Sequence, residues 1–170
     1  MSHQELPRSR NSGGGSVDLR RFSYGATSAV VTGMALVTGL DAANSTRVTI
    51  ISGLLIFAIA DNLTDSLSIH IYQESEHLDN RAAFRATLAN FATRLGLSLS
   101  FVLIVMLAPV TIAVFAAIVW GSGVLCAMTA LLARQRDVPI AGEIGKHLAL
   151  AAAVIAVSKG IGAWLLQALG

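Results

Sequence analysis

The segment from Val110 to Leu132 reads VTIAVFAAIVWGSGVLCAMTALL and contains no charged residue. A helix needs about 20 apolar residues to cross the hydrocarbon core of a bilayer, and this segment is long enough. Similar tracts recur along the 170 residues, of which 54% are hydrophobic and 13% are charged. Soluble domains carry roughly 25% charged residues. The sequence therefore predicts an integral membrane protein.

Five tracts have the composition of membrane spans. They run from about Phe22 to Leu40, Val48 to Tyr72, Leu95 to Leu107, Val110 to Leu132 and His147 to Leu169. The third is short, but the stretch from Asn80 to Arg94 before it is typical of a continuous amphipathic helix. Arg94 is expected to extend its side chain to the membrane interface. We expect an all-α integral membrane protein with five transmembrane helices.

The basic residues outside the spans indicate the orientation. They precede the first span, separate the second from the third, and separate the fourth from the fifth. They are Arg8, Arg10, Arg20, Arg21, Arg81, Arg85, Arg94, Arg134, Arg136 and Lys146, while the loops on the other side carry only Arg47. Cytoplasmic loops are enriched in Lys and Arg. This predicts a cytoplasmic N-terminus, an outside C-terminus and a multi-pass protein of the cell membrane, which in a bacterium is the plasma membrane.

The chain divides into a tail and one domain. Residues 1–18 are polar, with a Gly-rich stretch at 12–16, and are expected to form a disordered cytoplasmic tail. Residues 19–170 are expected to form a single five-helix transmembrane domain, with a short cytoplasmic helical extension at about 73–93. The lipid bilayer is the expected partner. Nucleic acid is not, because no compact basic patch interleaved with aromatic residues lies outside the spans.

Charged residues interrupt two of the spans. Asp61 and Asp65 lie in the second and Lys159 in the fifth, where a charge costs roughly 2.5 to 3.5 kcal/mol on insertion scales. At 100° per residue, one face of the second helix gathers several polar side chains within about 80°. They are Asp61, Asp65, Ser68, Tyr72 and Glu76. Hard oxygen ligands suit Mn²⁺ and Fe²⁺, so this face predicts an ion path from a cytoplasmic mouth at Glu76.

Lys159 is the expected partner of Asp61. Counted from the predicted starts of their spans, both residues lie about 18 to 20 Å along their helices, near the middle of a bilayer roughly 30 Å thick. Such a pair would act as a proton-linked switch for a transported cation. The alternative is a permanent structural pair that only holds the bundle together.

Three further patterns are weaker. His70, Glu74 and His77 share a second face of the same helix and form either a metal site or a solvated helix end. Glu143 and His147 are expected to form a plain interfacial pair. The Asp-x-x-x-Asp spacing of Asp61 and Asp65 also occurs in membrane prenyltransferases, but these need a second acidic motif on another span. No such motif exists here, so no enzymatic activity is expected.

Small residues recur at four-residue spacing on the first span. Gly25, Ala29 and Gly33 would let another helix approach closely. That helix belongs either to the same bundle or to a second copy of the chain. The second interpretation predicts a homodimer that forms through the first helix.

Several stretches together resemble the vacuolar iron transporter family, over residues 20 to 170. The first is RFSYGATSAVVT at 21–32, followed by VTGL at 37–40. The second is DSLS at 65–68, followed by Tyr72 and by residues 74–76. The third is the Ala-rich final span, with Gly160-Ile161-Gly162 near its end. No single motif is specific; the resemblance rests on their order and spacing.

The resemblance implies a homodimer that exports Fe²⁺ or Mn²⁺ from the cytoplasm in exchange for protons, along a path between the two first helices. The metal is the transported substrate, and no permanently bound cofactor is expected. The residues predicted as metal ligands, from the polar faces of the second span, are Asp61, Asp65, Glu74, Glu76 and His77. Ser28 belongs to the expected path and stands where the family has an acidic residue. The cytoplasmic metal-binding region is short, and the alternative is a non-transporting protein with the same fold and a structural or regulatory role.

Overall fold

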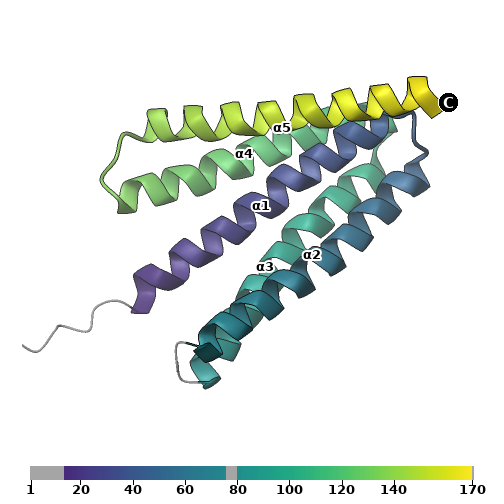
Figure 1. Ribbon diagram of the computed structural model, residues 1–170. Coiled ribbons are helices and arrows are strands. Elements are labelled where there is room, and N and C mark those ends of the chain that lie inside the picture. Colours follow the sequence, from purple (N-terminus) through teal and green to yellow (C-terminus); the bar gives the residue numbers. More distant parts are fainter. Residues whose placement is uncertain (1–13, 76–79, 170) are drawn as a thin grey trace, which may run out of the picture.

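The computed structural model describes residues 14–75 and 80–169, without the side chains of residues 14–24, 69, 70, 72–75, 80–83 and 86. These residues form five α-helices (Figure 1). They are α1 Gly14–Ala42, α2 Arg47–Ser75, α3 Asn80–Leu107, α4 Val110–Gln135 and α5 Ile140–Leu169. Each is long and apolar enough to cross a membrane. The predicted all-α fold with five membrane-spanning helices is therefore confirmed.

Most helix boundaries agree with the sequence to within a few residues. The continuous helix expected from Asn80 to Leu107 is α3. Pro109 separates α3 from α4, and its carbonyl oxygen accepts a hydrogen bond of 2.8 Å from the amide of Ala113 in the first turn of α4. Helix α1 begins at Gly14, within the segment expected to be disordered, because extending a formed helix costs less than starting one. Residues 1–13 lie outside the described residues.

Helix α1 is the centre of the bundle. It packs against all four other helices, and it lies between the α2–α3 pair and the α4–α5 pair (Figure 1). The pairs meet at the end that holds the α1–α2 loop, the α3–α4 junction and the end of α5, and they spread apart at the other end. The spread end holds the end of α2, the start of α3 and the α4–α5 loop, which lie in or beside the basic segments. We call it the basic end and the other one the opposite end.

This arrangement agrees with the five-span plan, because the basic segments share one end of the bundle. At the opposite end, the Arg47 guanidinium Nη2 donates a hydrogen bond of 3.1 Å to the carbonyl oxygen of Ala108, which links the start of α2 to the α3–α4 junction. That the basic end faces the cytoplasm remains a prediction from the positive-inside rule.

Small residues permit the close helix crossings around α1. A Cβ atom at Gly162 of α5 would overlap the carbonyl oxygen of Gly39 of α1, and one at Gly33 would lie 2.8 Å from the ring of Phe101 of α3. Ala29 is 1% exposed. The face formed by Gly25, Ala29 and Gly33 therefore packs against helices of the same bundle, and not against a second copy of the chain in this structure. The homodimer remains a prediction, without the support that this face was expected to give.

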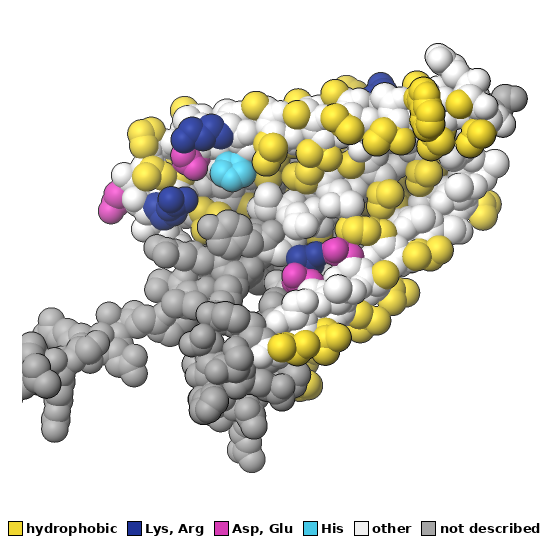
Figure 2. Space-filling view, in the orientation of Figure 1, with side chains coloured by type: hydrophobic (Ala, Val, Ile, Leu, Met, Phe, Trp, Pro, Cys, Tyr) yellow, Lys and Arg dark blue, Asp and Glu magenta, His cyan; other side chains and the backbone are white. Residues whose placement is uncertain are grey.

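The outer faces of the bundle are apolar. Large hydrophobic side chains are exposed along α2, α3, α4 and α5, among them Ile59, Leu63, Leu103, Phe115, Leu150 and Trp164. Figure 2 shows hydrophobic side chains along the length of two of the outer helices. Such a surface suits lipid rather than water. The described chain is a multi-pass membrane protein by this criterion as well as by helix length.

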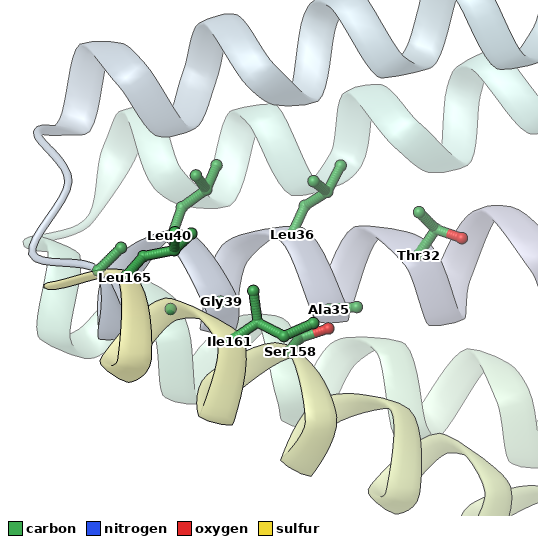
Figure 3. A pocket seen from close by; sticks show the side chains of 10 residues that line it. Thr32, Ala35, Leu36, Gly39, Leu40, Ser158, Ile161 and Leu165 are labelled. Carbon is green, nitrogen blue, oxygen red and sulfur yellow. The ribbon is translucent and has the colours of Figure 1, made fainter. Parts of the chain in front are cut away.

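An open groove of about 310 Å³ lies between α1 and α5 near the opposite end (Figure 3). Its walls are almost entirely aliphatic, and the hydroxyls of Thr32 and Ser158 are the polar side-chain groups that line it. No charged side chain lines it. The groove therefore provides no ligands for an ion.

Candidate functional site

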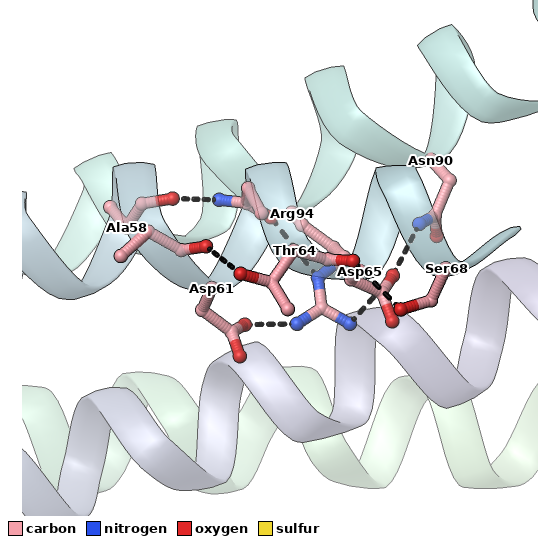
Figure 4. Close-up of polar contacts among 9 residues, drawn as sticks. Ala58, Asp61, Thr64, Asp65, Ser68, Asn90 and Arg94 are labelled. Atoms are coloured by element: carbon pink, nitrogen blue, oxygen red, sulfur yellow. Dashed lines mark hydrogen bonds and ion pairs between the residues drawn. The ribbon is translucent and has the colours of Figure 1, made fainter. Parts of the chain in front are cut away.

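Two aspartates of α2 share one arginine of α3 (Figure 4). The Arg94 guanidinium contacts Asp61 Oδ2 through Nη2, and its Nη1 lies 3.2 Å from Asp65 Oδ2. Asp61 and Asp65 are one helical turn apart, so both carboxylates point to the same side of α2. With all three groups ionised, the cluster carries one net negative charge. We call these three residues the ion cluster.

Two asparagines fix the geometry of the ion cluster. The Arg94 Nε donates a hydrogen bond of 3.0 Å to Asn62 Oδ1, and the Asn62 Nδ2 donates to the carbonyl oxygen of Ala58. The Asn90 Nδ2 donates a hydrogen bond of 2.9 Å to Asp65 Oδ2. Both asparagines are buried. The arginine side chain is therefore held on three sides, and its charge-assisted hydrogen bonds are the strong kind.

Helix α1 closes the ion cluster on a further side. A Cβ atom at Gly25 would lie 2.7 Å from Asn90 Oδ1 and 3.0 Å from Arg94 Cδ. Real Cβ atoms do not approach oxygen so closely, so glycine is required for this contact. Gly25, which the sequence pattern assigned to a helix-packing face, thus allows α1 to contact the ion cluster.

The three charged side chains differ in exposure. The Arg94 side chain is 4% exposed, whereas those of Asp61 and Asp65 are 33% and 34% exposed. In Figure 2 a basic side chain lies between two acidic ones on the visible surface of the bundle, away from its ends. The expectation that Arg94 reaches the membrane interface is wrong. Two carboxylates at its own level compensate its charge, so burial costs less than it would for an unpaired cation.

The ion cluster lies near the middle of α2, slightly toward the basic end. At 1.5 Å per residue, Asp61 is about 21 Å and Asp65 about 27 Å from the first residue of α2 at the opposite end. Because α2 ends at Ser75, Asp61 is equally far from both ends of the helix and Asp65 is closer to the basic end.

Lys159 is not the partner of Asp61. Its side chain is exposed on α5, α1 lies between α5 and α2 (Figure 1), and Asp61 binds Arg94 instead. The predicted pair is wrong. One cause is the start of α5, which lies at Ile140 rather than His147 and places Lys159 farther along its helix than the sequence suggested.

The depths of Lys159 and the ion cluster also differ. Gly39 of α1 lies against Ser158, and Gly25 of α1 lies against Arg94. These two glycines are about 21 Å apart along α1. Lys159 therefore lies near the opposite end, where a long side chain can reach the polar interface.

Among the predicted site residues whose side chains the structure describes, Ser68 and Ser28 do not join the ion cluster. The Ser68 hydroxyl donates a hydrogen bond of 2.9 Å to the carbonyl oxygen of Thr64 in its own helix. Ser28 is exposed on α1. Tyr72 and Glu74 belong to α2, but their side chains, like that of His70, lie outside the described residues, as do Glu76 and His77 entirely. The ladder expected beyond Ser68 therefore stays a prediction.

A polar pattern on α3 could have indicated the partners of the two aspartates from the sequence. Asn90, Arg94 and Ser98 repeat at four-residue spacing along α3, which places these polar groups on one face of the helix. All three are buried. Asn90 Oδ1 and Ser98 Oγ have no hydrogen-bond partner within the described part of the chain. This face of α3 thus brings unused oxygen acceptors to the level of the ion cluster.

The fold and the ion cluster define a class, a multi-pass helical membrane protein with a shared arginine between two intramembrane carboxylates. The comparisons with known proteins do not narrow this class: no family model, no curated protein and no solved structure matches the chain. Among the described residues, no group of three or more His, Cys, Asp or Glu side chains could hold a metal ion. The function therefore has to be argued from the ion cluster.

Proposed function

We propose that this protein is a membrane transporter that exports a divalent transition metal ion, Fe²⁺ or Mn²⁺, from the cytoplasm in exchange for protons. One observation carries the proposal. Two intramembrane carboxylates share a single guanidinium, and each keeps about a third of its side chain exposed. Ionisable residues inside a membrane usually mark ion pathways or proton relays, because burying them is costly.

In this proposal Arg94 occupies the cation position when no metal is bound. Its guanidinium lies among carboxylate and amide oxygens, which are the hard ligands that suit Mn²⁺ and Fe²⁺. The carboxylates of Asp61 and Asp65 and the free Oδ1 of Asn90 supply such oxygens. An arriving divalent cation displaces the arginine, and the arginine returns when the cation leaves. A tethered competitor of this kind keeps the metal from binding too tightly to be released.

In this scheme the two carboxylates of the ion cluster bind the exchanged protons. Arg94 takes part by moving its side chain, because an arginine keeps its charge in proteins. Asp61 and Asp65 are the groups that can take up protons after the metal has left. A proton on either carboxylate balances part of the charge that the metal removes.

The shape of the bundle supports access from the basic end. The helix pairs spread apart there and meet at the opposite end (Figure 1), and Asp65 lies on the side of the α2 midpoint that is toward the spread end. If the basic end faces the cytoplasm, the arrangement suits uptake of the substrate from that side. Export then requires a second state in which the opposite end opens.

Metal flux into proteoliposomes tests the proposal. We expect Mn²⁺ to enter vesicles that contain the wild-type protein and Asp61→Asn to lower the rate at least about tenfold, since the ligand charge is lost. Asp41→Asn is the matched control, because Asp41 lies in the last turn of α1 at the opposite end. It should leave the rate unchanged. Equal rates for the wild type, Asp61→Asn and protein-free vesicles would overturn the proposal.

A second candidate is a non-transporting membrane protein with the same fold. The observation that favours it is the complete use of Arg94 by Asp61, Asp65 and Asn62, which is what a permanent structural cluster would show. The two functions differ in the effect of Arg94→Gln. A transporter should then bind Mn²⁺ more tightly and release it more slowly, whereas a structural cluster should lose stability without gaining any metal affinity.

A further inference from the structure

A second polar region lies between α4 and α5, at the basic end. It is a cavity of about 260 Å³ in the angle between the two helices. Its polar lining residues are Thr129 and Arg136 from α4 and its C-cap, and Glu143 and His147 from α5. Leu132, Ala133 and Val138 complete the wall. The ion cluster contributes no residue to it, so the two regions are separate sites.

The α4–α5 loop fixes the mouth of this cavity. Asp137 has a positive φ of 51°, which lets the chain reverse directly after α4. The amides of Arg136 and Val138 then donate hydrogen bonds of 3.2 Å to the carbonyl oxygen of Ala133 in the last turn of α4. The backbone of Arg136 is thereby fixed at the C-terminal end of α4, beside the cavity.

Three groups in the cavity have unused hydrogen-bonding capacity. Thr129 is 4% exposed, and its hydroxyl has no hydrogen-bond partner among the residues that the structure describes. The Arg136 guanidinium forms no ion pair within the same set of residues. The His147 Nδ1 lies 2.8 Å from the carbonyl oxygen of Glu143, which can only accept, so Nδ1 carries a proton and Nε2 remains available.

The charge balance favours an anion over a metal. The Glu143 carboxylate is already bound by Lys146, at 2.8 Å between Oε1 and Nζ. Arg136 and Lys146 together outweigh this single carboxylate. Among the lining residues, a divalent cation would find Glu143, His147 and the Thr129 hydroxyl as side-chain ligands and would lie beside Arg136, which repels it. A tetrahedral oxyanion would instead accept hydrogen bonds from Arg136 and from the Thr129 hydroxyl.

We propose that this cavity binds a phosphate group. Arg136 provides the charge, Thr129 a buried hydroxyl and His147 a donor when its ring is protonated. The phosphate comes either from the head group of an anionic phospholipid in the adjacent leaflet or from free phosphate in solution. Basic pockets between transmembrane helices on the cytoplasmic side are known sites for lipid head groups. The site does not depend on the proposed transport.

Native mass spectrometry of the full chain in detergent tests this site. The probes are phosphatidylglycerol and inorganic phosphate, with phosphatidylcholine as the zwitterionic reference. We expect at least one anionic probe to bind the wild type and to bind Arg136→Gln about tenfold more weakly, since a charge-assisted hydrogen bond is lost. Arg134→Gln is the matched control, because Arg134 is exposed in the same helical turn but does not line the cavity.

The outcomes separate the two sources of phosphate. Binding of phosphatidylglycerol that inorganic phosphate does not displace identifies a lipid site, and displacement or direct binding of inorganic phosphate identifies a site for the free ion. Thr129→Val, which keeps the side-chain shape, should weaken binding severalfold, and Thr129→Ser should restore it. The proposal is overturned if neither probe binds, or if Arg134→Gln weakens binding as much as Arg136→Gln. Circular dichroism of each variant verifies that the helices are intact.

Discussion

The α2–α3 pair and the α4–α5 pair differ in whether their positively charged side chain is buried. In the first pair, Arg94 is buried and binds two carboxylates and an amide. In the second pair, Lys159 is exposed on α5 and lies near the opposite end. Burial therefore follows the partner and not the type of residue. A cation enters the bundle where a neighbouring helix provides negative charge, and remains at its surface where none does.

The difference between the pairs should be largest when the compensating charges are removed. Asp61→Asn combined with Asp65→Asn leaves Arg94 buried without any counter-charge, although the amide oxygens can still accept hydrogen bonds. We expect a loss of about 3 kcal/mol in the free energy of unfolding, because an uncompensated buried charge is strongly destabilising. Thermal or denaturant unfolding in detergent micelles measures it. A double variant as stable as the wild type would show that the ion cluster does not hold α2 to α3.

A smaller effect should follow from moving α1 away from the ion cluster. Gly25→Ala places a Cβ atom against Asn90 and Arg94, so either α1 or these side chains must shift. We expect a loss of about 1 kcal/mol in stability, the low end of overpacking effects, and a lower Mn²⁺ flux.

Gly96→Ala is the control for this substitution. Gly96 lies on α3 two residues from Arg94, and an added Cβ atom meets no other heavy atom within 4 Å. Because alanine forms helices better than glycine, this variant should be at least as stable as the wild type. If the two variants have the same stability, the contact between α1 and the ion cluster does not contribute to the free energy of unfolding.

The sequence predicted the helices better than it predicted the ion cluster, for a physical reason. Span length and apolar composition are local properties, so all five helices could be located and most of their boundaries predicted within a few residues, except the starts of α1 and α5. Which helix faces meet depends on how the bundle packs. Asp61 and Asp65 were identified because charges in a span are conspicuous, but Lys159 was predicted as the partner of Asp61, and Arg94 was expected at the membrane interface. The predicted depths of Asp61 and Lys159 were counted separately from the start of each helix, which assumes that each helix starts at a surface of the bilayer. The contacts of Gly25 with Arg94 and of Gly39 with Ser158 show that the two charged sites lie at different levels along α1.

The smallest effect should come from Lys159 itself. Lys159→Met removes a charge that has no partner among the described residues and that lies near a polar interface, so stability should change by no more than about 0.5 kcal/mol. The same substitution at Arg94, Arg94→Met, removes the counter-charge of two carboxylates and should cost several times more. Unfolding of both variants in one detergent gives the comparison directly. Mn²⁺ flux should likewise be unchanged in Lys159→Met and altered in Arg94→Met. If Lys159→Met instead proves as damaging as Arg94→Met, then Lys159 has a partner in the membrane that one copy of the chain does not supply, and the contrast between the two helix pairs holds only for the isolated chain.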